Sequence, residues 1–260
     1  MNSSELTFIA VQAALKAGEI LEKGFGTSFK ISSKPGRQNL VTEYDKASEK
    51  LIKSMILDAF PSHAILAEES GSEGTNPVQW IVDPLDGTVN FAHSIPIFSV
   101  SIGVAVEGKL VTGVVFAPML NELFIAQEGQ GAYLNDVRLK VTATDTLDAA
   151  FIATGFPYNV DENPLHCIDA FTHMTKLGIP TRRLGSAAID LAYVAAGRFD
   201  AFWEVSLEPW DIAAGKLLVQ EAGGRVTQYD GSERDVFNSK TVLASNGHLH
   251  DHMIKELEKR

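Results

Sequence analysis

The chain has 260 residues and 45% hydrophobic content, enough to build one large domain or two lobes that share a core. Asp and Glu number 33 against 22 Lys and Arg, and the resulting net charge of -11 disfavours nucleic acid and anionic membranes as main partners. The single cysteine, Cys167, excludes an internal disulfide and a cysteine-based zinc site and suits a reducing compartment.

The N-terminal segment lacks the basic start and continuous apolar core of a signal peptide, and no apolar run approaches the length of a membrane span. We therefore expect a soluble cytoplasmic protein without a membrane partner. Apolar residues at helical spacing predict helices over residues 4–24 and 43–60. Thr42 and Asp45 have the spacing of a capping box at the second helix, and the polar residues 30–39 predict a loop before it.

Short apolar runs separated by turn residues predict strands in the middle of the chain. These strands are expected at residues 64–67, 80–82, 98–106, 110–118, 123–127 and 131–135. Glu107-Gly108-Lys109 separates two long apolar runs and predicts a hairpin.

The second half of the chain alternates between helix and strand signals. Helices are predicted near 164–177 and at 187–197, 209–224 and 250–259, and strands at 151–156, 200–205, 225–230 and 241–246. With no internal repeat or linker, this order predicts a layered α/β fold. We expect one domain over residues 1–260, with two closely packed lobes at about 1–145 and about 146–260.

The segment WIVDPLDGTVNF places two acids three residues apart, just after an apolar run. A β-turn explains the residue types, but it does not explain why two mutually repelling carboxylates, Asp83 and Asp86, share one turn. A divalent cation would neutralise them, and oxygen ligands, with the Leu85 carbonyl as a third, favour Mg2+. Gly87 and Thr88 follow where a helix could start, and such N-termini bind phosphate. The segment therefore predicts a metal site beside a phosphate site.

Three other acids lie at the ends of predicted elements. Glu68 follows a strand, where a solvated loop acid is the simpler interpretation. Asp211 lies in the first turn of a helix, where it could act only on the helix dipole, and Asp45 could only complete its capping box. Spacing alone does not establish that these acids converge. No nucleophilic triad is indicated, because its candidates are scattered: Ser186, His166 and Asp190.

Four segments carry a family resemblance: AEES, WIVDPLDGTVNF, LGSAAIDLAYVAAGRFDAFWE and EPWDIAAGKLLVQEAGG. They resemble the inositol monophosphatase family, and most of all its bacterial inositol-1-monophosphatase branch. The similarity covers nearly the whole chain, and the DPLDGTVNF and PWDIAAG signatures are long and specific. It implies an α-β-α-β-α sandwich of the sugar-phosphatase type, usually a homodimer, with two or three Mg2+ ions.

The resemblance also implies a role for each matching position. The implied metal ligands are Glu68, Asp83, the Leu85 carbonyl, Asp86 and Asp211. Asp45 and Thr88 are implied to activate the attacking water together with Glu68. The implied phosphate and substrate contacts are Asp86, Gly87, Thr88, Gly185, Ser186, Ala187, Glu204 and Asp211. Lys34 matches a basic residue on a loop that shields the metals.

The predicted activity is Mg2+-dependent hydrolysis of inositol 1-phosphate by a metal-activated water, without a covalent intermediate and with sensitivity to lithium. A related phosphatase acting on fructose 1,6-bisphosphate, histidinol phosphate or NADP would share the same metal site. The alternative of another class is a regulatory binding protein of the transcription machinery. The intact acid set favours an enzyme, because a protein that only binds has no physical need for mutually repelling carboxylates.

Overall fold

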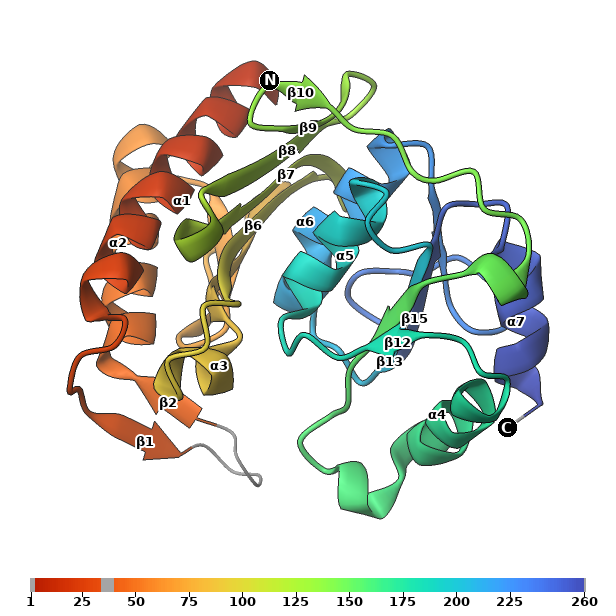
Figure 1. Ribbon diagram of the computed structural model, residues 1–260. Coiled ribbons are helices and arrows are strands. Elements are labelled where there is room, and N and C mark those ends of the chain that lie inside the picture. The colour runs from red at the N-terminus through yellow and green to blue at the C-terminus, as the bar shows by residue number, and fades with distance from the viewer. Residues whose placement is uncertain (1–2, 34–39, 260) are drawn as a thin grey trace.

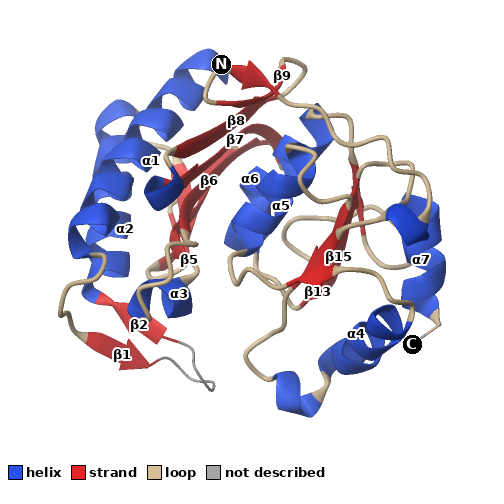
Figure 2. Ribbon diagram, in the orientation of Figure 1, coloured by secondary structure: helices blue, strands red, loops and turns tan. Residues whose placement is uncertain are grey.

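In the computed structural model, which describes residues 3–33 and 40–259, two large sheets enclose a pair of helices, and further helices cover both outer faces (Figure 1). The helices on the outer face of the first sheet are α1 (Ser3–Gly24) and α2 (Glu43–Ala59), those between the sheets are α5 (Ala187–Ala195) and α6 (Pro209–Glu221), and those beyond the second sheet are α4 (Cys167–Lys176) and α7 (His250–Glu258). Figure 2 shows the resulting order of layers. The predicted α-β-α-β-α sandwich is confirmed.

The first sheet has eight strands in the order β10-β9-β8-β7-β6-β5-β3-β4. The strands are β3 (Ala64–Ala67), β4 (Gly71–Glu73), β5 (Val78–Asp86), β6 (Ser99–Val106), β7 (Lys109–Ala117), β8 (Glu122–Gln127), β9 (Gly131–Leu134) and β10 (Val137–Arg138). β3 runs parallel to β5, and the other neighbours are antiparallel. Glu107 and Gly108 both have positive φ at the tight turn between β6 and β7, which confirms the predicted hairpin.

The second sheet has five strands in the order β12-β11-β13-β15-β14. They are β11 (Ile152–Thr154), β12 (Thr181–Arg182), β13 (Ala201–Val205), β14 (Arg225–Thr227) and β15 (Thr241–Ser245). A separate ribbon pairs β1 (Ile31–Ser33) with β2 (Leu40–Thr42). The predicted loop over residues 30–39 was therefore wrong at its start, since the backbone of Ile31–Ser33 pairs with β2. The predicted loop residue Lys34 lies outside the described residues.

The middle helix α6 is buried along most of its length because it packs against both sheets. It approaches the first sheet so closely that a Cβ atom on Gly113 of β7 would lie 2.6 Å from the carbonyl oxygen of Ala214. Only glycine permits that approach. Ser101 on β6 donates a hydrogen bond to the carbonyl of Trp210 at 3.2 Å, near the start of the helix. These contacts fix the N-terminal end of α6, which carries Asp211.

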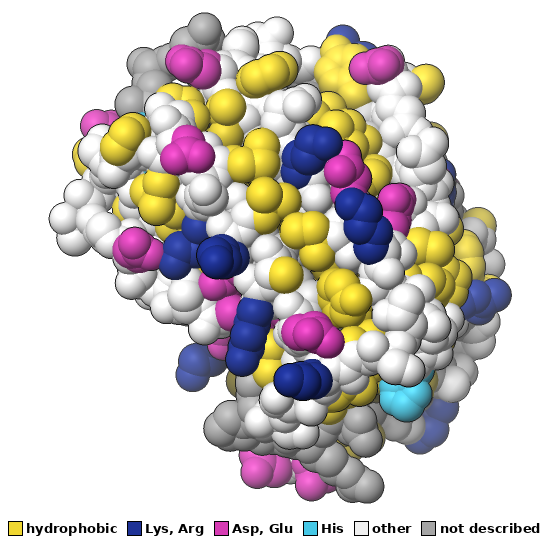
Figure 3. Space-filling model, turned by 90° about the vertical axis from the view of Figure 1, so that its left-hand side faces the viewer, with side chains coloured by type: hydrophobic (Ala, Val, Ile, Leu, Met, Phe, Trp, Pro, Cys, Tyr) yellow, Lys and Arg dark blue, Asp and Glu magenta, His cyan; other side chains and the backbone are white. Residues whose placement is uncertain are grey.

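The outer face of the molecule at α1 and α2 carries Lys, Arg, Asp and Glu side chains interspersed with apolar ones (Figure 3). One of the apolar side chains on α1, Phe8, is 61% exposed. Within the described part of the chain, no helix combines the length and the apolar character needed to cross a membrane. Acidic and basic side chains are mixed on the face formed by α1 and α2, so that face carries no single sign of charge although the whole chain is negative.

Candidate active site

A cavity of about 1150 Å³ opens where the end of β5, the start of α5, the end of β13 and the start of α6 meet. Most of the predicted site residues lie on its wall. They are Glu68, Asp83, Leu85, Asp86, Gly87, Thr88, Gly185, Ser186, Ala187, Glu204 and Asp211. Asp45 is fully buried behind the wall, and Lys34 is not described. The structure thus brings together side chains that are up to 143 positions apart, from Glu68 to Asp211.

The parallel pairing of β3 and β5 explains how Glu68 reaches Asp83. The carboxyl ends of parallel strands meet at the same edge of a sheet, so the residues that follow them become neighbours. The backbone N–H of Glu68 donates to the carbonyl of Val82 at 3.2 Å and places Glu68 beside Asp83, the next residue of β5. β5 itself runs through Asp86, farther than predicted, with an irregular register between Asp83 and Asp86. This irregularity directs the end of the strand into the cavity wall.

Asp83 lies deeply buried among the other acids of the cavity. It is 2% exposed, and one of its oxygens, Oδ1, accepts the backbone N–H of Leu85 at 3.0 Å. Burial, followed by the negative charges of Glu68, Asp86 and Asp211, raises the pKa of Asp83 well above its ordinary value. Burial, followed by the charges of Asp86 and Glu68, likewise raises the pKa of Asp211. The acids therefore act on one another, as the sequence alone could not establish.

Asp86 is held by the first turn of α5. Its Oδ2 accepts the hydroxyl of Ser186 at 2.6 Å and the backbone N–H of Ala188 at 2.8 Å. Burial raises the pKa of Asp86 to about 6, although these hydrogen bonds oppose the rise. Ser186 is also the N-cap of α5, so its hydroxyl accepts the backbone N–H of Ile189 at the helix start and donates to Asp86.

Gly87 follows Asp86 and turns the chain into the short helix α3 (Thr88–Ala92). Its φ of 93° is in the left-handed region, and a Cβ atom there would lie 3.1 Å from the carbonyl oxygen of Ile97 and 3.2 Å from that of Gly185. A larger residue is therefore excluded by both conformation and space. Asn90 on α3 donates to the carbonyls of Ile97 and Leu184, at 2.7 and 2.8 Å, and so ties the two walls of the cavity together.

Thr88 links the cavity to the buried Asp45. Its Oγ1 lies 3.0 Å from Asp45 Oδ1 and 3.0 Å from the carbonyl oxygen of Leu85. The other oxygen of Asp45 accepts the backbone N–H of Thr42 at 2.7 Å and its hydroxyl at 2.5 Å, which confirms the capping box. Burial raises the pKa of Asp45, and the bonds from Thr42 and Thr88 counteract the rise. Asp45 is therefore suited to accept a proton through Thr88.

Glu204 lies on the opposite wall, on β13, and is 7% exposed. Burial and the charge of Asp86 raise its pKa to about 8, while Arg183 acts in the opposite direction. Its carboxyl group packs directly against Gly155, where an added Cβ atom would overlap the carboxyl oxygens. Glu204 is therefore held in one place by the strand end next to it.

The cavity wall also contains residues that the predicted site lacked, among them Tyr158, Arg183 and Asp190. Asp190 had a usable signal, because it follows the predicted contact Ser186 by four residues on a helix. Tyr158 and Arg183 had none, since they lie in irregular segments that no local pattern connects to the acids.

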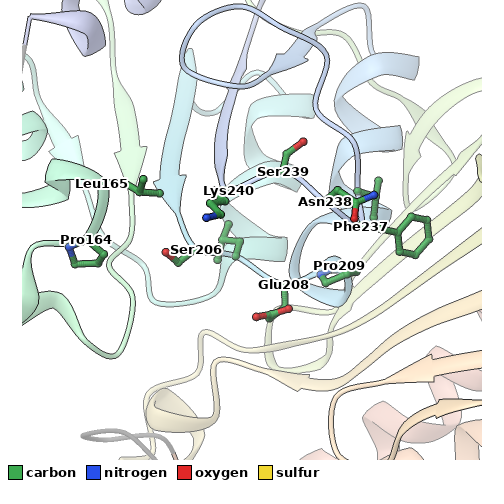
Figure 4. A pocket seen from close by; sticks show the side chains of 11 residues that line it. Pro164, Leu165, Ser206, Glu208, Pro209, Phe237, Asn238, Ser239 and Lys240 are labelled. Carbon is green, nitrogen blue, oxygen red and sulfur yellow. The ribbon is translucent and has the colours of Figure 1, made fainter.

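A smaller cavity of about 540 Å³ lies beside the start of α6 (Figure 4). It shares Ser206, Leu207 and Glu208 with the larger one. Among the described residues that line it, Glu208 and Lys240 are the charged ones, so it lacks the set of acids found in the larger cavity. The larger cavity is therefore the candidate active site.

Comparison with known proteins agrees with this arrangement. The model of the inositol monophosphatase family matches residues 2–260. A Nus factor SuhB from Escherichia coli K12 is 45% identical over 240 residues, covering 91% of this chain and 90% of the relative. An inositol-1-monophosphatase from Caulobacter vibrioides is 42% identical over 252 residues, covering 95% and 98%. The solved inositol monophosphatase of Anabaena (Nostoc) sp. PCC 7120 superposes with a TM-score of 0.88 at 39% identity, covering 100% and 97%. The chain belongs to the inositol monophosphatase family.

Proposed function

We propose that the chain is a Mg2+-dependent phosphomonoesterase that hydrolyses inositol 1-phosphate. The observation that supports this proposal most is the convergence of Glu68, Asp83, Asp86 and Asp211 on one cavity. Burial and mutual repulsion raise the pKa of three of them, so a bound cation would relieve a cost that the fold otherwise carries. The family membership supports the reaction class.

The donor set suits a hard cation. It consists of carboxylate oxygens and one backbone carbonyl, the ligands that Mg2+ prefers. The hydrogen bonds described above engage a single oxygen in Asp83 and in Asp86, and in Asp211 the Oδ2 atom accepts the backbone N–H of Glu208 at 2.8 Å. This arrangement is compatible with the second oxygen of each acid binding an ion. Across the described residues, no group of three or more His, Cys, Asp or Glu side chains is arranged so that it could hold a metal ion by itself. Ions at this site would therefore keep several water ligands, as Mg2+ usually does.

Bound divalent cations would supply charge neutralisation for the phosphate and would make a bound water more acidic. The protein's own part in the reaction lies with Thr88 and Asp45. The Thr88 hydroxyl is positioned to accept a proton from the attacking water while passing its own proton to Asp45 Oδ1, 3.0 Å away. Burial raises the pKa of Asp45, which increases its capacity to hold that proton. The backbone at Gly87 and Thr88 would hold the phosphate.

Glu204 supports a polyol as the leaving group. A buried carboxyl group in the wall opposite the metal acids accepts hydrogen bonds from substrate hydroxyls. In its ionised form it disfavours a second phosphate at the same place, because two anions would then meet in a partly desolvated cavity. Inositol 1-phosphate should therefore be a better substrate than fructose 1,6-bisphosphate. Because the chain belongs to the inositol monophosphatase family, we also propose that millimolar lithium inhibits the reaction.

The test is phosphate release from four candidate substrates at saturating Mg2+. Inositol 1-phosphate should give the highest kcat/KM, ahead of fructose 1,6-bisphosphate, histidinol phosphate and NADP. A higher kcat/KM for one of the other three would support the proposed phosphatase activity but would identify a different substrate. No phosphate release from any of them would contradict the enzymatic proposal itself.

A second, regulatory role is favoured by one observation: relatives that share 45% identity with this chain are named Nus factor SuhB. We propose that such a binding role, where present, uses the surface and not the acids of the cavity. An Asp83→Asn variant would then lose phosphatase activity and keep any partner. Loss of both would show that partner binding requires the metal site. The homodimer and the cytoplasmic location stay predictions.

A further inference from the structure

One buried carboxyl group on the cavity wall has an oxygen without a hydrogen-bond partner. Asp190 is 1% exposed and lines the cavity, and its Oδ1 accepts no hydrogen bond within the described part of the chain. Buried polar atoms of folded proteins almost always have a partner, so an unpaired oxygen at a ligand site requires a donor from elsewhere.

Asp200, another buried acid, shows the usual situation. It is buried to a similar degree, and its two oxygens accept the hydroxyl of Thr142 at 2.5 Å and the backbone N–H of Phe151 at 2.7 Å. It does not line the cavity. The two acids therefore form a matched pair, one satisfied by the protein and the other with an oxygen left for a ligand.

Helix geometry places Asp190 on the same face as two predicted substrate contacts. It follows Ser186 by four residues and Ala187 by three on α5, and both spacings bring side chains together on one side of a helix. The first turn of α5 holds Asp86 through Ser186 and Ala188. Asp190 lies one turn farther along the same wall.

The neighbour of Asp190 across the cavity is Glu204. Their elements, α5 and β13, pack against each other, and both side chains line the cavity. Burial, followed by the charge of Glu204, raises the pKa of Asp190 well above its ordinary value, with a smaller effect of Asp86. Two buried carboxyl groups that line one cavity can both accept hydrogen bonds from hydroxyl donors.

We propose that Asp190 is a second specificity-determining residue, which accepts a hydrogen bond from a substrate hydroxyl other than the one at Glu204, directly or through one bound water. The inference rests on the proposed function, since it assumes a polyol phosphate. It narrows the substrate class to phosphates whose alcohol carries at least two further hydroxyl groups. A phosphate with an apolar leaving group leaves Asp190 unpaired.

The first test compares Asp190→Leu with Asp200→Leu. Leucine keeps the size of the side chain and removes the acceptor. Asp190 has an unpaired oxygen, so its replacement should leave Tm unchanged or raise it. Both oxygens of Asp200 are hydrogen-bonded, so its replacement should lower Tm. In Asp190→Leu, kcat/KM for inositol 1-phosphate should fall about 10- to 100-fold and that for phenyl phosphate by less than about threefold. Asp200→Leu should show no such difference between substrates.

The second test combines the variants with monodeoxy analogues of inositol 1-phosphate, each of which lacks one hydroxyl. With the wild type, one analogue should have a kcat/KM about 10- to 100-fold below that of inositol 1-phosphate. With Asp190→Leu, the same analogue and inositol 1-phosphate should have equal kcat/KM values. A different analogue should behave in this way with Glu204→Gln. A merely structural role of Asp190 would not couple to a single hydroxyl of the substrate.

The proposal is overturned if Asp190→Leu lowers kcat/KM equally for inositol 1-phosphate and phenyl phosphate, or if it leaves kcat/KM for inositol 1-phosphate unchanged. It is overturned as well if every deoxy analogue that loses kcat/KM with the wild type loses as much with the variant. It is also overturned if Asp190→Leu lowers Tm as much as Asp200→Leu does. A wild type that hydrolyses phenyl phosphate but not inositol 1-phosphate would instead overturn the proposed substrate, and this inference with it.

Discussion

Asp45 uses its two oxygens for different purposes. Oδ2 closes the capping box of α2 with Thr42, and Oδ1 lies 3.0 Å from the hydroxyl of Thr88 at the cavity. The helix cap fixes the carboxyl group so rigidly that its free side can serve the reaction without a further support. The structural and the catalytic interpretations of Asp45 are thus compatible, because one side chain satisfies both.

Thr88→Val tests the catalytic side of this arrangement. Valine keeps the shape of threonine and removes the hydroxyl between the cavity and Asp45. We expect kcat to fall by about 10²-fold or more, the typical contribution of a positioned proton acceptor. Thr88→Ser is the matched control, since it keeps the hydroxyl and should stay within about tenfold of the wild type. Equal losses in the two variants would show that the methyl group matters and the hydroxyl does not.

Asp83→Asn tests the role of the acids. The change removes one charge from a buried group whose pKa is raised by burial and by Glu68, Asp86 and Asp211. In EDTA, Tm should therefore stay the same or rise, because repulsion is relieved. At saturating Mg2+, kcat should fall on the order of 10²- to 10³-fold, comparable with the loss of one electrostatic group from an active site. A variant with near-normal kcat would remove Asp83 from the proposed metal ligands.

Side chains that line the cavity could be predicted from the sequence where an acidic residue type coincided with the end of a predicted strand or helix. Asp83 and Asp86 were identified in this way, whereas Asp211 entered the predicted site through the family resemblance. The environment of His250 could not be predicted, because its partners lie on other strands. It is fully buried between the hydroxyls of Thr227 and Ser245, at 2.7 and 2.8 Å. Burial lowers its pKa to about 4.

At the scale of elements, the cavity exists because strand ends and helix starts meet at one place. β3 and β5 deliver acids at their carboxyl ends, α5 and α6 begin beside them, and β11 supports β13 from the side. The last contact is the tightest, since Gly155 directly after β11 packs on the Glu204 carboxyl group. The alignment of these two strand ends therefore sets the orientation of Glu204.

Gly155→Ala tests this alignment. The added methyl group would overlap the Glu204 carboxyl group, which must rotate away. We expect kcat/KM for inositol 1-phosphate to fall about tenfold, the cost of one misplaced charged hydrogen bond, with little change for phenyl phosphate. The double variant with Glu204→Gln should lose little more than either single one, because both act on the same contact. Additive losses would separate Gly155 from Glu204.

Long elements with a strong periodic pattern were predicted well, whereas several of the shortest strands were missed. The helices at 4–24 and 43–60 correspond to α1 and α2 within a residue at each end. β4, β10 and β12 were missed, because two or three residues carry no period and their pairing depends on distant strands. The parallel register of β3 and β5, which creates the acid cluster, is likewise a long-range property that no local pattern encodes.

At the scale of the whole molecule, the cavity makes stability depend on pH. Burial raises the pKa of Glu204 from 4.5 to about 8 and that of Asp86 to about 6. An acid that binds its proton more tightly when folded stabilises the fold at low pH, and this contribution is lost as the pH rises from its unfolded to its folded pKa. His63 and His250, whose pKa values burial lowers, act oppositely but only up to about pH 6.5.

The free energy of unfolding in EDTA should therefore fall between pH 6.5 and 8, as measured by urea titration. Glu204→Gln should reduce the slope, because glutamine does not titrate. Saturating Mg2+ should also reduce it, since a cation binds the ionised form of acids such as Asp86. A free energy that stays constant or rises over this range, with no effect of Glu204→Gln, would show that Glu204 keeps an ordinary pKa.

The central claim is that the acids of this cavity hold metal ions that hydrolyse a phosphomonoester. The most direct measurement is phosphate release from inositol 1-phosphate by protein freed of metal with EDTA and then titrated with Mg2+. We predict no release above background without metal, full recovery with Mg2+, and a recovery in Asp83→Asn that is lower by on the order of 10²- to 10³-fold. Turnover that persists after complete removal of metal, or a wild type that stays inactive at saturating Mg2+, would contradict the account.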